Sequence, residues 1–141
     1  MTSVDPAAAD LERSSERWLA WLALETSRRQ GSAGSAVYAL WDALEEWFAS
    51  DDFAGSPLAA AMVAPPDGRG PAAHAVLIRH RQATRQLLED LASSAGARDP
   101  AALAGQLLTL VEGAMAGALI DRHPGVARHA RELTRIAMAS G

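Results

Sequence analysis

The sequence contains no cysteine, no lysine and no asparagine. Without cysteine there are no disulfides and no thiolate metal sites, so nothing points to an oxidising compartment. All 13 basic residues are arginine and alanine is abundant, a composition that indicates a GC-rich genome rather than a special chemistry. The formal net charge of −4 gives no broad basic field, which argues against nucleic-acid binding by this chain alone.

The common catalytic and cofactor motifs are also missing. The sequence has no GxSxG turn, no HExxH pair and no glycine-rich loop that follows a strand, so we expect no metal and no cofactor. The N-terminal segment lacks the basic-then-apolar order of a signal peptide. The longest apolar run is interrupted by Gln106 and Glu112 and is too short for a membrane span, so we expect a cytoplasmic protein.

Prolines mark the expected beginnings of helices. Five of the seven follow a capping or turn residue: Asp5-Pro6, Ser56-Pro57, Gly70-Pro71, Asp99-Pro100 and His123-Pro124. No stretch shows the sustained alternation of apolar and polar residues that a strand needs. The positions of the prolines and of the residues before them therefore predict an all-α fold, a bundle of about six helices.

The expected helices divide the chain at a small-residue connector, Gly31 to Ser35. Residues 1–34 are expected to form an N-terminal helix and flexible connector, and residues 35–141 the main domain. In the first helix we expect the buried side to extend to Leu24, and in the last helix we expect Leu133 to be buried. The predicted helices cover 6–29, 36–50, 57–63, 71–94, 99–121 and 124–139, with a proline- and glycine-rich loop over 64–71.

The helix over 99–121 is apolar around nearly its whole circumference, so it should be covered on more than one side. One face carries Leu103, Leu107 and Val111 at core spacing. A second face is built from small residues, with Gly113 and Gly117 four apart, and would let two backbones approach closely. The pattern favours a helix shared between the core of the domain and a dimer interface.

The helix over 71–94 places His80 and Thr84 on its apolar stripe. A histidine at this position either bonds a ligand, acts as an acid or base near neutral pH, or is a buried imidazole satisfied by a carbonyl. Glu112 poses the same question, because an ionised carboxylate in an apolar helix is costly unless it is paired. If His80 and Glu112 faced one cavity, they would form an acid–base pair.

The segment from about Tyr38 to Met138 resembles the C-terminal ligand-binding and dimerisation domain of TetR-family transcriptional regulators. The likeness rests on LWDALEEWFASDDFAGSPLAAAM, on HAVLIRHRQATRQLLEDLASSAGARDPAALAGQLLTLVEGAMAGALID and on PGVARHARELTRIA. It covers roughly two-thirds of the chain. It implies dimerisation through the last two helices. The front of the chain departs from the family, because 35 residues with one expected helix leave no room for a helix-turn-helix.

In the family, an inducer occupies a cavity between the helices of this domain, and the resemblance implies corresponding residues here. Trp18 and Trp21 are expected either to cap this cavity or to cover apolar surface. The alternative for the implied ligand-binding set is plain core packing, especially for its aromatic members. The set is Tyr38, Trp41, Leu44, Phe48, Met62, Leu77, His80, Thr84, Val111, Glu112 and Met115. The implied dimer interface is Thr109, Gly113, Ala116, Gly117, Ile120, Ala130, Leu133 and Ala137.

Three functions remain open from the sequence. The first is a dimerising domain that binds a small, mostly apolar molecule and lacks a DNA-binding head. The second is an enzyme on the same scaffold, a cyclase or isomerase with His80 and Glu112 as acid and base. The third is a modulator that heterodimerises with a full-length regulator.

Overall fold

The computed structural model describes residues 5–65 and 67–140. These residues form seven helices and no strand, which confirms the predicted all-α fold. The helices are α1 (Pro6–Ala33), α2 (Ala36–Phe48), α3 (Asp51–Ala54), α4 (Pro57–Val63), α5 (Pro71–Ser94), α6 (Pro100–Asp121) and α7 (Val126–Ser140). Pro66, within the predicted loop, lies outside the described residues.

Four of the five proline signals mark helix starts as predicted, at α1, α4, α5 and α6. The side chains of Asp5, Ser56 and Asp99 accept hydrogen bonds from the first backbone N–H groups, while Gly70 has no side chain to do so. The fifth signal is wrong by two residues, because α7 begins at Val126 rather than at Pro124. The chain enters α7 through turns closed by hydrogen bonds between residues i and i+3. In these turns the N–H groups of residues 126, 127 and 128 donate to the carbonyls of residues 123, 124 and 125.

The ends of the first two helices also differ from the prediction, and one short helix is additional. The first helix continues to Ala33 instead of ending at Arg29, and it stops where Gly34 adopts a left-handed conformation with φ 91°. The second helix ends at Phe48 rather than at Ser50. Ser50 instead caps the short helix α3, which the sequence pattern did not predict, by accepting from the N–H of Phe53 at 3.2 Å.

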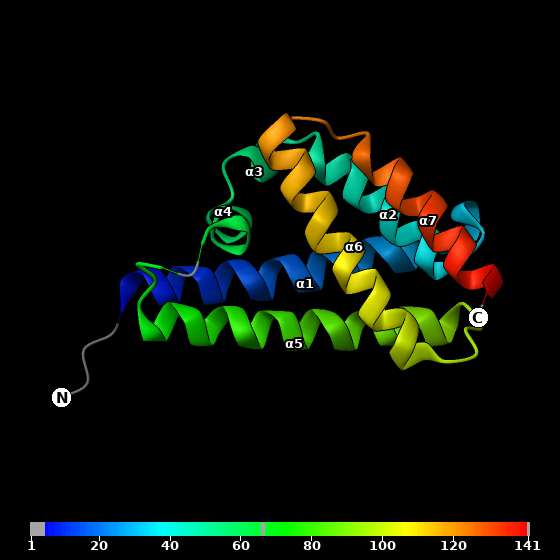
Figure 1. Ribbon diagram of the computed structural model, residues 1–141, viewed down its shortest axis with the longest axis horizontal. Helices are drawn as coiled ribbons and strands as arrows, with labels where there is room; N and C mark the ends of the chain where they lie inside the picture. Colours follow the sequence, from blue (N-terminus) through cyan, green and yellow to red (C-terminus); the bar gives the residue numbers. More distant parts are fainter. Residues whose placement is uncertain (1–4, 66, 141) are drawn as a thin grey trace.

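The helices form two pairs, which meet where α1 packs against α2 and which α6 crosses (Figure 1). Helices α1 and α5 run parallel along one side, with Ser15 beside His80 and Glu12 beside Arg79. Helices α2 and α7 run antiparallel on the other side. Helix α6 crosses between the pairs and packs against α4, α5 and α7.

One hydrophobic core joins most of these elements. Helix α6 contributes eight of its residues to the interior, in keeping with the predicted core face. Helix α1 belongs to the same core, since Trp18 and Leu22 are buried in it. Two expectations are wrong: Leu24 is 60% exposed and Leu133 is 51% exposed, because both lie on the solvent side of their amphipathic helices.

The outer face of α6 is uncovered within the chain. Thr109, Gly113 and Ile120 are exposed, with Ile120 at 75%, whereas Ala116 and Gly117 are half-buried. By length and composition alone, α6 is apolar enough to cross a membrane. Less than half of its most apolar stretch of 18 residues is buried inside the chain. The helix thus presents more apolar surface than the chain covers.

Candidate functional site

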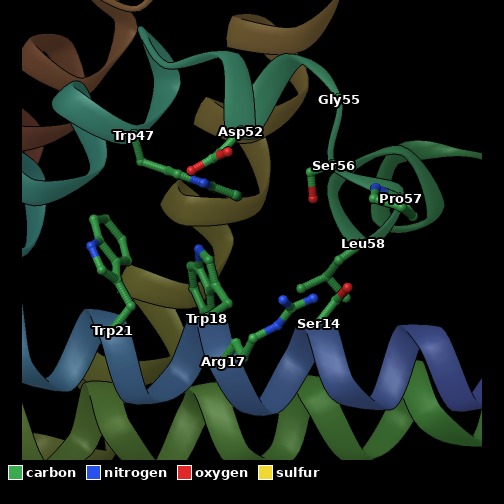
Figure 2. A pocket seen from close by; sticks show the side chains of 10 residues that line it. All are labelled: Ser14, Arg17, Trp18, Trp21, Trp47, Asp52, Gly55, Ser56, Pro57 and Leu58. Atoms are coloured by element: carbon green, nitrogen blue, oxygen red, sulfur yellow. The ribbon is translucent and has the colours of Figure 1, made fainter.

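A cleft of about 370 Å³ opens between α1, the end of α2 with α3, and the start of α4 (Figure 2). Helix α1 supplies one wall, and the turn through Gly55 that precedes α4 brings the opposite wall over it. This volume is within the range of small-molecule sites. The lining residues are Ser14, Arg17, Trp18, Trp21, Trp47, Asp52, Gly55, Ser56, Pro57 and Leu58.

Three tryptophans dominate the apolar end of the cleft. The ring centroid of Trp47 lies 5.6 Å from that of Trp18 and 6.4 Å from that of Trp21, with tilted planes. Behind it, Phe53 packs edge-on against Trp47 at 4.7 Å. Tilted aromatic contacts of this kind hold the rings in place, so the cleft has a rigid, flat-walled apolar end.

Trp18 forms the floor of the cleft and packs on a buried polar pair, His80 and Ser15. Trp18 packs on His80 of α5 with 5.3 Å between ring centroids. The Nδ1 atom of His80 lies 2.7 Å from Oγ of Ser15, and both residues are buried. Burial lowers the pKa of His80 from 6.5 to about 4, while the charge of Glu112 acts in the opposite direction. His80 is therefore neutral near pH 7 and supports Trp18 from beneath.

The polar end of the cleft is rich in hydrogen-bond donors. Arg17 is exposed and forms no ion pair or hydrogen bond with the residues that the structure describes. The hydroxyl of Ser56 accepts from the N–H of Ala59 at 3.0 Å, which leaves its own proton free to donate. Trp18 is only 6% exposed, yet its indole Nε1 has no hydrogen-bond partner within the described part of the chain. A buried donor without an acceptor is uncommon and costly.

None of the eleven implied ligand-binding residues lines this cleft. They lie instead in or against the packed interior. Trp41 and Leu44 are fully buried, and the ring of Tyr38 is covered by the guanidinium of Arg131 at 4.7 Å. Phe48, Leu77, Thr84, Val111 and Met115 are buried, whereas Met62 is half-buried. The structure shows core packing at these positions, and their role in ligand binding stays a prediction.

His80 and Glu112 do not form a hydrogen-bonded pair. His80 bonds to Ser15, while Glu112 accepts two hydrogen bonds from Arg81, at 2.7 and 2.8 Å. The hydroxyl of Thr84 donates to the backbone carbonyl of His80 at 2.7 Å, so it too is used internally. The ion pair of Glu112 satisfies its carboxylate at the half-exposed edge of α6. The arrangement provides no acid–base couple across a cavity.

The residues of the implied dimer interface divide into three groups by exposure. Leu133 of α7 is exposed along with Thr109, Gly113 and Ile120 of α6, and Ala116, Gly117 and Ala137 are half-buried. Ala130 is 4% exposed because it packs inside the chain, so it offers little surface to a partner. Most of the implied set therefore remains accessible in the isolated chain.

Sequence reasoning singled out Trp18 and Trp21 but missed Arg17, Trp47 and Asp52. The spacing of Trp18 and Trp21, three apart on one helix, was the available signal for the α1 wall. Trp47 lies at helical spacing with the buried residues of α2, so its position in the sequence does not distinguish it from a core residue. The fold brings it to the cleft because α2 ends one residue later and the chain turns back through α3.

Within residues 5–65 and 67–140 no group of three histidine, aspartate or glutamate side chains is placed to hold a metal ion. Comparisons of the chain with protein families, with curated proteins and with solved structures find no match. The cleft and the exposed face of α6 are therefore the two features from which a function can be inferred.

Proposed function

We propose that this chain is a cytoplasmic domain that binds a small, mostly apolar molecule and dimerises. The observation that carries the proposal is the cleft, in which three tryptophans form an apolar end and a few polar side chains lie opposite. Small-molecule sites typically combine such aromatic walls with a small number of polar groups that fix orientation. We place the binding site in this cleft rather than among the buried core residues.

The likeness to the ligand-binding half of TetR-family regulators is part of the proposal. The order of elements supports it: α2, a turn with Phe53, Gly55 and Ser56 before α4, the long α5, and the apolar α6 followed by α7. Nucleic-acid binding is not carried over from the family. Three of the four arginines of α1, Arg13, Arg28 and Arg29, pair with carboxylates, so α1 offers no row of unpaired arginines to a phosphate backbone.

The binding site can be tested by filling the cleft from its wall. Ser14 lines the cleft, so Ser14→Trp should occupy the space that a ligand needs. Ser27→Trp places the same side chain on an exposed position of the same helix, outside the cleft, and is the matched control. The probes are three naphthalenes that differ in charge: 2-naphthamide, 2-naphthoate and 2-naphthylmethylammonium. Isothermal titration calorimetry measures their affinity, and native mass spectrometry of gently purified protein detects any retained molecule.

We expect at least one probe to bind with 1:1 stoichiometry to the wild type and to Ser27→Trp, and not to Ser14→Trp. If no probe binds and no added mass is retained, the chain is not a small-molecule binder of this kind. Equal binding to both tryptophan variants would place the site elsewhere and overturn the assignment to the cleft.

We also propose that the uncovered face of α6 is occupied by a second copy of the chain. The small residues Gly113 and Ala116 allow close approach of a helix, and Ile120 supplies apolar area at the end of the face. A Cβ atom at Gly117 would instead meet Val126 of α7 within the same chain, at 3.5 Å. The apolar surface that α6 exposes in the isolated chain supports this interface. A full-length regulator docked on the same face is the alternative occupant, and the oligomeric state distinguishes the two.

A further inference from the structure

We infer that the molecule bound in the cleft carries a negatively charged group, of the carboxylate class, on a flat apolar body. This inference rests on the proposed function, because it names the ligand chemistry of the same cleft. It depends on three separate features: the unpartnered indole N–H of Trp18, the neighbouring Arg17, and the balance of donors over acceptors in the lining.

The first feature is the indole N–H of Trp18. The side chain is more than nine-tenths buried and its Nε1 donates to no described residue, although the residue lines the cleft. The other buried tryptophan, Trp41, donates its Nε1 to the hydroxyl of Thr134 at 2.7 Å. Figure 2 shows the nitrogen of Trp18 on the edge of its ring that is turned toward Asp52. The nitrogen itself is covered, so an acceptor atom of a ligand in the cleft would satisfy this donor once the side chains over it move aside.

The second feature is Arg17, which is adjacent to Trp18 in the sequence. Figure 2 shows its guanidinium between Trp18 and Leu58, over the polar end of the cleft. Most arginines of α1, including Arg13, Arg28 and Arg29, are paired with a carboxylate, whereas Arg17 is not paired with any described residue. A planar guanidinium with several free N–H groups is well suited to a carboxylate.

The third feature is the balance of hydrogen-bonding groups. Arg17, Trp18, Ser14 and Ser56 all offer donors, and Asp52 is the one carboxylate among the lining residues. Asp52 and Arg17 are both exposed, so solvent screens the two charges alike, and the additional neutral donors favour a ligand with acceptor atoms. The tryptophans would hold the flat part of the ligand, while the donors hold its anionic group.

The three naphthalenes test this inference because they share a ring system and differ only in the charged or polar group. We expect 2-naphthoate to bind roughly five- to ten-fold more tightly than 2-naphthamide, and 2-naphthylmethylammonium to bind most weakly. Arg17→Gln should remove the preference for the carboxylate: it should weaken 2-naphthoate strongly and 2-naphthamide less, because only the carboxylate forms a charge-assisted hydrogen bond with Arg17. Arg28→Gln, on the same helix but outside the cleft, is the matched control and should keep the preference.

Two further variants examine the other groups. Trp18→Phe keeps an aromatic ring but removes the N–H, so it should weaken binding of both 2-naphthoate and 2-naphthamide. Asp52→Asn should strengthen 2-naphthoate, because it removes the only negative charge among the lining residues. Arg17 and Asp52 are both exposed, so Arg17→Gln and Asp52→Asn are expected to fold. They test the preference for an anion even if Trp18→Phe is unstable.

The outcomes separate the inference from the proposed function. If the neutral probe binds in the cleft and charge makes no difference, or if the ammonium probe binds best, the anion inference is wrong and small-molecule binding stands. If none of the three probes binds, the proposed function itself fails. A carboxylate preference that survives Arg17→Gln would also overturn the inference.

Discussion

Buried polar side chains in this protein mostly satisfy one another across helices. His80 of α5 bonds to Ser15 of α1, and Trp41 of α2 bonds to Thr134 of α7. Each bond joins two elements that are adjacent in space but far apart in sequence, by 65 and 93 positions. Because unpaired polar groups are costly in an apolar interior, each bond also fixes how its two helices are aligned.

The pKa of His80 predicts a pH-dependent stability. In the unfolded chain the imidazole takes up a proton near pH 6.5, but in the folded protein only near pH 4, because burial disfavours the charged form. The unfolded state therefore binds more protons between these values, and the free energy of unfolding falls as the pH drops from about 6.5 to about 4. The loss should reach a total on the order of 3 kcal/mol once the pH is below about 4, where the folded state is protonated as well.

Urea denaturation at a series of pH values measures this effect. His80→Gln should remove most of the decrease, whereas His129→Gln, which changes an exposed histidine, should preserve it. If the wild type and His80→Gln lose stability in parallel below pH 6.5, other groups cause the acid sensitivity and the buried histidine does not.

The bond between Trp41 and Thr134 predicts a difference between two similar substitutions. Thr134→Val keeps the branched shape but leaves the indole N–H of Trp41 buried without an acceptor, at a cost of about 1–3 kcal/mol. Thr134→Ser keeps the hydroxyl and should cost less. Chemical denaturation of both variants measures the difference, and equal destabilisation would show that packing, rather than the hydrogen bond, accounts for the effect.

For single residues, the sequence predicted burial but not the partners of the buried side chains. The apolar stripe on α5 was sufficient to predict that His80 and Thr84 are buried. It did not indicate that Ser15 is the partner of His80, because a serine on the face of a different helix carries no periodic signal. The same limit hid the cleft, since Arg17, Trp47 and Asp52 meet only after three separate elements have folded together.

At the scale of elements, local chemistry determined most of what could be predicted. The pairs Asp5-Pro6, Ser56-Pro57 and Asp99-Pro100 begin helices because the first residue caps the orphan N–H groups and the proline needs none. The prediction at His123-Pro124 was wrong because α6 ends at Asp121 and the next residue, Arg122, has a left-handed conformation with φ 52°. The chain then needs a turn before a new helix can begin.

The backbone at Arg122 predicts a stabilising substitution. A left-handed conformation costs a residue with a Cβ atom about 1 kcal/mol, and glycine avoids this cost. Arg122→Gly should therefore raise the free energy of unfolding by up to about 1 kcal/mol. Arg98→Gly is the control, because Arg98 is not among the described residues with positive φ, and there glycine should only destabilise. Thermal unfolding of both variants measures the two signs, and a lower midpoint for Arg122→Gly would contradict the account.

At the scale of the whole molecule, α6 connects the core to the exterior. One side of the helix carries Leu107 and Val111 into the core, and the other side leaves Gly113 and Ile120 exposed. This two-faced character was visible in the sequence, because apolar residues surround the helix and small residues fall on one line. The molecule that covers the outer face could not be predicted, because the sequence of one chain does not identify its binding partner.

The proposed dimer predicts opposite effects of one substitution on folding and on association. A Cβ atom added at Gly113 would meet nothing within 4 Å in the isolated chain, so Gly113→Leu should fold and gain about 1 kcal/mol of helix propensity. In a dimer, the leucine would separate two closely packed backbones. Gly31→Leu is the matched control, because Gly31 is also helical and equally open but lies on α1. Size-exclusion chromatography with light scattering should give a dimer for the wild type and Gly31→Leu, and a folded monomer for Gly113→Leu. A wild type that remains monomeric at high concentration would leave the face of α6 to a different protein, and a dimeric Gly113→Leu would place the interface elsewhere on the molecule.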